Sequence, residues 1–149
     1  MIVREALSQL KKFGTCFYED FPGFYDIQTA ISTYRQNKTN LDEIAQPFRI
    51  SSYYSLQGIN SIKNGVMKIG GISANFPVYE CLYYPDLENK IRYDETSKGS
   101  LIGYHEMTIV GWTETHWIVL NSWGKYYGDN GICYIPFDYP IVEAWAIID

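Results

Sequence analysis

The amino-acid sequence predicts an α+β protein in which N-terminal helices precede an antiparallel, β-barrel-like sheet. Apolar residues recur at helical spacing in the first third of the chain. Later segments alternate, or form short apolar runs between glycines and prolines, as strands do. The chain has 149 residues, of which 46% are hydrophobic and 19% are charged. A chain of this length and composition is able to bury a core, so we expect one folded domain over residues 1–149.

Residues 1–47 are predicted to be helical and to form a partial helical lobe. Apolar side chains three or four positions apart lead up to Gly14, which would end a first helix. Asp26 would cap a second helix. A third, short helix is expected over residues 41–45, because a polar stretch with capping-box spacing precedes it and Pro47 follows it.

Residues 48–149 are predicted to form a β-lobe. One short helix is expected over residues 59–63, and a loop over residues 76–100, where prolines and charged residues gather. The expected strands are residues 48–53, 66–72, 106–112, 117–120 and 132–135, with an apolar tail at 141–148 that would close the sheet.

The charge pattern and the apolar runs argue against two classes of partner. The net charge is −5 and no block of lysines and arginines is present, so we do not expect nucleic-acid binding. No run of 18 apolar residues occurs, so we expect no membrane-spanning helix. The N-terminus also lacks the apolar core of a signal peptide, and the sequence does not indicate a cellular compartment.

The three cysteines are Cys16, Cys81 and Cys133. They are odd in number and widely spaced, which does not fit a disulfide scaffold. The sequence has no C-x-x-C motif and only two histidines, so we expect no metal site and no cofactor.

One hairpin carries residues with a recognisable chemistry. His105 opens one expected strand, and Asn121 follows the next strand at a separation of 121 − 105 = 16 residues. In an antiparallel hairpin the start of the first strand lies beside the end of the second, so the two side chains are expected to meet. The amide would then orient the imidazole, as in Cys-His-Asn catalysis, and Trp123 would shield the hydrogen bond from water.

The stretch from Gly103 to Ile135 resembles the C-terminal signature of papain-like cysteine peptidases. His105 matches the family's catalytic histidine, Asn121 its orienting asparagine and Trp123 the tryptophan that covers them. The resemblance implies a papain-like fold and peptide or protein substrates. The positions that match the family's turn glycines are Gly111, Gly124, Gly128 and Gly131. Weaker similarity covers residues 4–16 and 64–67.

The family's nucleophile is a cysteine in a Cys-Gly-Ser/Ala-Cys-Trp/Tyr context, about 130–150 residues before the histidine. Counting back from His105 leads to a point before Met1, so the sequence resembles the last two-thirds of such a peptidase. None of the three cysteines has the family context, since the residues that follow them are Phe17, Leu82 and Tyr134. We therefore identify no nucleophile in this chain.

Three hypotheses follow from a histidine and an asparagine without a nucleophile. In the first, the chain is a truncated or separately made part of a peptidase, active only with a Cys-bearing partner segment. In the second, it is a pseudoenzyme that binds peptides or proteins. In the third, it is an assembly subunit that forms homo-oligomers. We expect the isolated chain to be inactive and to associate through a surface near Met107, Trp123 and Tyr126, whereas a monomer would favour an independent module. Glu106 and Met107 stand where the family has small residues, and would face the missing lobe or a specificity pocket.

Overall fold

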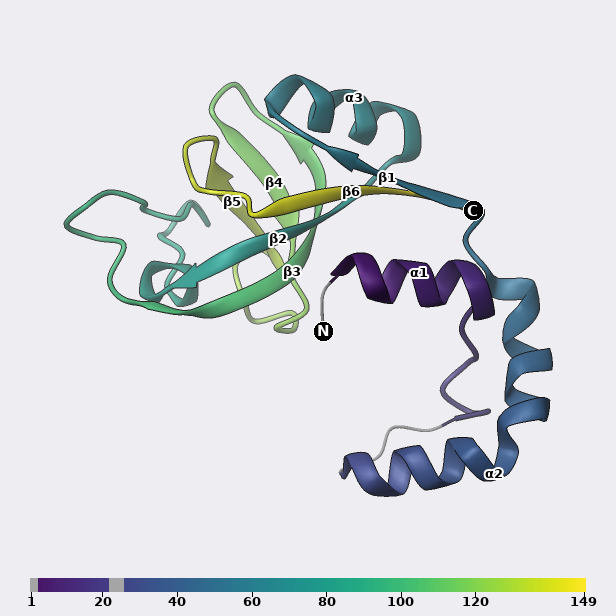
Figure 1. Cartoon of the computed structure of the whole chain (residues 1–149). Coiled ribbons are helices and arrows are strands. Elements are labelled where there is room, and N and C mark those ends of the chain that lie inside the picture. Colours follow the sequence, from purple (N-terminus) through teal and green to yellow (C-terminus); the bar gives the residue numbers. More distant parts are fainter. Residues whose placement is uncertain (1–2, 22–25) are drawn as a thin grey trace. The chain divides into compact units, whose positions relative to one another are not determined.

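The computed structural model describes residues 3–21 and 26–149, which divide into two compact units (Figure 1). The first unit extends to Tyr53 and includes the last two residues, and the second spans Tyr54–Ile147. The predicted lobe boundary at residue 48 stays a prediction. The elements are, in order, α1 (Val3–Phe13), α2 (Ile27–Ala45), the 3-10 helix η1 (Gln46–Phe48), β1 (Ser52–Leu56), α3 (Ile59–Ile69), β2 (Ile72–Tyr79), the 3-10 helix η2 (Glu80–Tyr83), β3 (Leu101–Trp112), β4 (His116–Leu120), β5 (Ile132–Pro136) and β6 (Glu143–Ile148).

The first unit contains α1 and α2, and both predicted helix signals are confirmed. The main-chain N–H of Gly14 donates to the carbonyl of Leu10 at 3.0 Å, and its positive φ of 83° ends α1 in the left-handed conformation that favours glycine. Asp26 caps α2, because its Oδ1 accepts a hydrogen bond from the N–H of Thr29 at 2.9 Å.

The prediction of a separate third helix over residues 41–45 is wrong. α2 continues without a break from Ile27 to Ala45. No glycine or proline interrupts the polar stretch, and Lys38 forms an ion pair with Asp42 one turn later on the same helix face. Capping-box spacing does not start a helix where the preceding residues are already helical.

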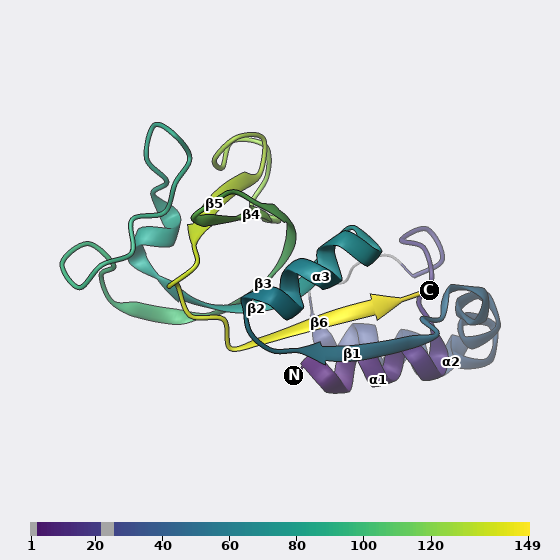
Figure 2. The ribbon, with the colours of Figure 1, turned by 90° about the horizontal axis from the view of Figure 1, so that it is seen from above.

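The predicted α+β class is confirmed, and the sheet is antiparallel and open rather than closed. Its six strands lie in the order β1-β6-β2-β3-β4-β5, so β1 and β5 form the two edges. Figure 2 shows that β2, β3, β4 and β5 curve around a common interior, which gives the sheet its barrel-like form. The three expected strands of the last third are present as β3, β4 and β5, and β3 begins earlier than predicted. The C-terminal tail forms β6, which pairs with β2 inside the sheet.

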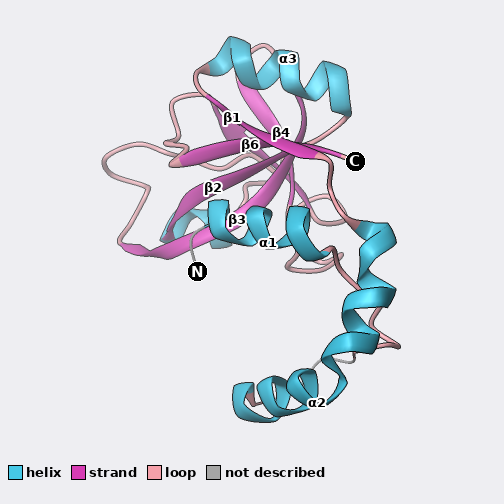
Figure 3. Cartoon of the chain, turned by 45° about the vertical axis from the view of Figure 1, so that its right-hand side comes forward, coloured by secondary structure: helices cyan, strands magenta, loops and turns pink. Residues whose placement is uncertain are grey.

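The predicted strand over residues 66–72 is wrong, because most of it belongs to α3. The helix passes through Gly65 and ends at Gly70, whose N–H donates to the carbonyl of Val66 at 2.8 Å. A Cβ on Gly65 would lie 2.7 Å from Cδ1 of Ile72, so glycine lets the helix lie close to the sheet. Figure 3 shows α3 along one side of the sheet, where it contacts β2 and β3.

β2 occupies residues 72–79, the last four of which were predicted to be a loop. Every second side chain of β2 is buried from Ile72 to Val78, as expected for a strand with one face in a core. Pro77 lies within this strand, opposite Tyr104 of β3. A proline therefore misled the sequence-based assignment here.

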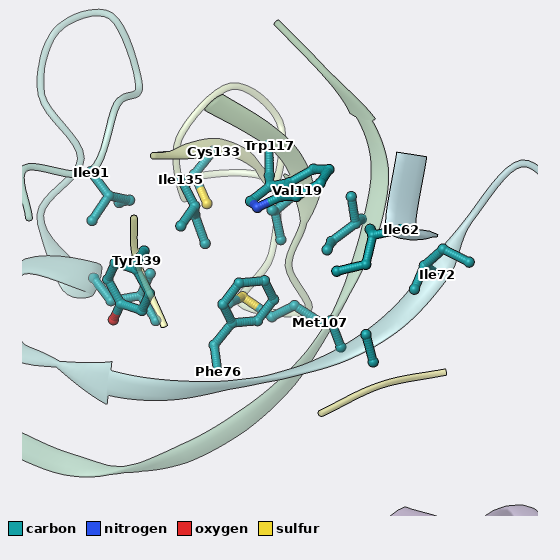
Figure 4. Close-up of a cluster of buried hydrophobic side chains, with 14 of the residues drawn as sticks. Ile62, Ile72, Phe76, Ile91, Met107, Trp117, Val119, Cys133, Ile135 and Tyr139 are labelled. Atoms are coloured by element: carbon teal, nitrogen blue, oxygen red, sulfur yellow. The ribbon is translucent and has the colours of Figure 1, made fainter. Parts of the chain in front are cut away.

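The hydrophobic core lies on the inner face of the curved sheet (Figure 4). Met107 is only 3% exposed and belongs to this core, so the prediction that it lies on a contact surface is wrong. Cys133 is also in the core, as predicted. The residues labelled in the close-up are Ile62, Ile72, Phe76, Ile91, Met107, Trp117, Val119, Cys133, Ile135 and Tyr139.

A matched pair of valines tests this core. Val119 on β4 is fully buried, whereas Val110 on β3 is 36% exposed. We expect Val119→Ala to lower the free energy of unfolding by about 2 kcal/mol, because it removes buried methyl groups and leaves a cavity. Val110→Ala is expected to cost less than about 1 kcal/mol. Urea unfolding of both variants checks this, and equal losses would contradict the assignment of the core.

Candidate active site

The hairpin of β3 and β4 carries the predicted histidine and asparagine. His105 lies within β3, opposite Phe76 of β2, and Asn121 directly follows the last residue of β4. Thr108 pairs with Leu120, so the chain leaving β4 passes the half of β3 that contains His105. Two segments of one hairpin thus bring the two side chains together.

A hydrogen bond joins the two side chains. Nε2 of His105 lies 2.9 Å from Oδ1 of Asn121. An amide oxygen only accepts, so with the amide in this orientation the ring donates its Nε2–H. In the neutral ring Nδ1 is then unprotonated and is able to accept a proton, as a general base must.

Asn121 is held rigidly on its main-chain side as well. Its side chain and backbone are 6% exposed, and its N–H donates to the carbonyl of Gly131 at 2.8 Å. The N–H of Gly131 in turn donates to the carbonyl of Tyr127 at 2.8 Å. The turn between β4 and β5 therefore holds the main chain at Asn121, and a neutral amide is easier to bury than a carboxylate.

Three aromatic rings gather around this hydrogen bond. Trp123 stacks on the His105 imidazole, with ring centroids 5.2 Å apart and planes 18° apart. Tyr83 stacks on Trp123 at 4.8 Å and 8°, and Tyr127 meets Trp123 edge-on at 5.1 Å and 80°. Trp123 thus lies where a cover over the hydrogen bond was expected, while its role stays a prediction.

Sequence reasoning did not assign Tyr83 or Tyr127 to the site. Tyr127 is buried, and its hydroxyl donates to the carbonyl of Leu82 at 2.6 Å. Burial raises the pKa of this phenol, which therefore stays protonated and acts as a structural donor. The only local signal for Tyr127 was its place between turn glycines. Tyr83 comes from a distant segment and had no such signal.

No cysteine of the described residues has the environment of a reactive thiolate. Burial raises the pKa of the Cys81 thiol, and it raises the pKa of Cys133 to about 11. Cys16 follows the C-terminal end of α1, whereas a nucleophilic cysteine is activated at a helix N-terminus. The expectation that Cys133 is a core residue is confirmed.

Glu106 lies on the sheet face opposite His105, as the strand alternation requires. Its carboxylate accepts hydrogen bonds from Ser73 Oγ at 2.6 Å and from Asn75 Nδ2 at 3.0 Å. These partners on β2 satisfy the carboxylate, so it does not compete with Asn121 for the imidazole. Whether this face meets another lobe or a substrate stays a prediction.

Within residues 3–21 and 26–149, no three His, Cys, Asp or Glu side chains gather as a metal-binding group. In the same part of the chain, every helix is too short or too polar to cross a membrane.

Residues 5–139 match the sequence family described as papain family cysteine protease. The chain belongs to this papain family. Its relatives accordingly support a peptidase-type function. The gut-specific cysteine proteinase of Caenorhabditis elegans is 33% identical over 88 residues, which cover 56% of this chain and 26% of that protein. The cathepsin B-like cysteine proteinase 2 of Haemonchus contortus is 29% identical over 84 residues, or 54% and 23% of the two chains.

A solved cysteine protease structure shows the same fold. Xylellain, a cysteine protease from Xylella fastidiosa, matches with a TM-score of 0.81 and 21% sequence identity. The match covers 99% of this chain and 61% of xylellain. The chain spans about a quarter of the length of the curated relatives it matches.

The reactivity of the three thiols tests whether His105 activates any of the described cysteines. We expect iodoacetamide at neutral pH to modify Cys16 first, because it is partly exposed, and Cys81 and Cys133 only after unfolding, because burial raises their pKa. His105→Ala should leave all three rates unchanged. Mass spectrometry of tryptic peptides measures this. Rapid labelling of Cys81 or Cys16 that depends on His105 would contradict the absence of a nucleophile.

Proposed function

We propose that this chain supplies the histidine and the orienting asparagine of a Cys-His-Asn peptidase site that acts on peptides or proteins. The observation that carries the proposal is the 2.9 Å contact between Nε2 of His105 and Oδ1 of Asn121. It leaves Nδ1 as the ring nitrogen able to take a proton from a thiol. Family membership supports cysteine as the nucleophile.

In this scheme the cysteine thiol gives its proton to Nδ1 of His105 and attacks the scissile carbonyl carbon as a thiolate. His105 then returns the proton to the leaving amine, and a thioester remains. Water hydrolyses the thioester, giving one proton to His105, which returns it to the cysteine sulfur. Asn121 keeps the ring in one orientation through both steps and carries no charge.

The thiol in this scheme comes from outside the described residues. Cys81 and Cys133 are buried with raised pKa values, and Cys16 has no helix N-terminus to activate it. We therefore propose that a Cys-bearing partner segment completes the site and that the chain alone is inactive.

Fusion to a nucleophile-bearing segment tests this proposal. The isolated chain should not hydrolyse a fluorogenic dipeptide amide. Fusion to the N-terminal, cysteine-bearing part of a papain-family relative should restore hydrolysis. In that fusion, His105→Ala should lower kcat by about 10²–10⁴-fold, as expected for loss of a general base. His116→Ala is the matched control and should leave kcat unchanged. His116 begins β4, and its Nδ1 is hydrogen-bonded to Thr115 Oγ1 rather than to Asn121.

Two results would contradict the proposal. One is hydrolysis by the isolated chain that is lost on Cys16→Ser. The other is a folded, active fusion in which His105→Ala has no larger effect than His116→Ala.

A second candidate function is a non-catalytic peptide-binding or assembly module. It is favoured by exposed apolar side chains at the start of β3, namely Leu101, Ile102 and Tyr104, close in sequence to His105. Exposed apolar patches of this kind mark association sites. Of the residues predicted to form the contact surface, Met107 is buried and Tyr126 is exposed. We therefore propose the start of β3 as a contact surface in place of Met107.

Sedimentation velocity at micromolar concentration tests this second candidate. We expect the chain to associate, and Leu101→Glu to shift it toward monomer, because a carboxylate is costly to bury in an apolar contact. Leu87→Glu is the matched control, since Leu87 is fully exposed in a loop. A chain that is monomeric without either substitution would remove the support for an assembly role.

A further inference from the structure

Trp123 stacks on a tyrosine that the peptidase scheme does not use. Tyr83 lies against Trp123 with ring centroids 4.8 Å apart and planes within 8° of parallel. Trp123 also stacks on His105, with ring centroids 5.2 Å apart and planes 18° apart. The indole therefore contacts two rings whose planes lie close to its own.

Tyr83 is carried by a turn that has little freedom to move. It ends η2, in which the N–H of Glu80 donates to the carbonyl of Ser100 and the N–H of Cys81 to the carbonyl of Lys98, both at 3.1 Å. The neighbouring Leu82 is fully buried. These contacts hold the main chain that carries Tyr83, whose side chain is 43% exposed and stacks on Trp123.

The same turn is tied to the site by a second contact. The carbonyl of Leu82 accepts the hydroxyl of Tyr127 at 2.6 Å, and Tyr127 meets the edge of Trp123. Trp123 itself stands on the loop after β4, next to Gly124, whose φ is 89°. In addition to this loop, the rings of Tyr83 and Tyr127 contact the indole, one stacked on it and one edge-on.

We propose that Tyr83 is a positioning residue that holds Trp123 parallel to the His105 imidazole and so keeps water from the His105–Asn121 hydrogen bond. This inference rests on the proposed function, because only that function requires the hydrogen bond to be oriented and shielded. Tyr83 acts through Trp123 and does not itself touch the imidazole–amide pair.

Exchange of the imidazole proton with water measures the shielding directly. In the ¹⁵N-labelled chain, the Nε2–H signal of His105 is identified by its loss in His105→Ala, and its exchange rate with water is measured by NMR. We expect Tyr83→Ala to raise this rate about tenfold, because one face of the indole loses its aromatic partner. Tyr83→Phe should restore the original rate, since the ring and not the hydroxyl makes the stack.

Tyr84→Ala is the matched control. Tyr84 is 78% exposed, and its ring is tilted by 56° to that of Tyr83, with centroids 6.4 Å apart. We expect it to leave the exchange rate unchanged. Tyr83→Leu covers the case in which Tyr83→Ala fails to fold, because it keeps bulk but presents no flat ring. It should also raise the rate.

The outcomes separate this inference from the proposed function. If the Nε2–H signal is absent, or does not change in Asn121→Ala, the orienting role of Asn121 is wrong and both proposals fall. If the signal depends on Asn121 but neither Tyr83→Ala nor Tyr83→Leu changes its exchange in a folded chain, only the positioning role of Tyr83 is overturned.

Discussion

Burial of Met107 and Ile109 sets the register of β3, and that register decides which side chain faces Asn121. Both residues lie in the core, and Phe76, also fully buried, is the partner of His105 across the strand pair. A slip of one residue would turn His105 outward and bring Glu106 to the core face. The core therefore supplies more than stability, because it excludes an arrangement with a carboxylate beside Asn121.

The immediate surroundings of the hydrogen bond are neutral and largely aromatic. Asn121 is almost fully buried. Trp123 contacts the rings of both Tyr83 and Tyr127. A hydrogen bond removed from water is stronger, but a buried charge would be costly without a partner. The amide of Asn121 accepts a hydrogen bond from the imidazole and brings no charge into the aromatic surroundings.

Local features of this protein were predictable from sequence, and features set by distant segments were not. The His105–Asn121 contact arises within one hairpin, whose two strands were recognisable from alternation and turn glycines. The segment after Gly65 was misassigned, because a short apolar run fits a buried strand as well as a helix. The helix prevails there since glycine allows α3 to approach Ile72. Tyr83 and Trp123 are far apart in the sequence and meet only in the folded chain, so no local sequence pattern predicts their contact.

The residues that contact the imidazole, and the rings that contact Trp123, all belong to the second compact unit, and none of them depends on a nucleophile for its position. β3 and β4 place His105 and Asn121, the turn before β5 places Tyr127, and η2 places Tyr83. Groups whose rotamers are fixed by packing and hydrogen bonds are already in reacting geometry before a substrate arrives. In the proposed function, a base preorganised in this way would take a proton at Nδ1 from a thiol that none of the described cysteines is placed to supply.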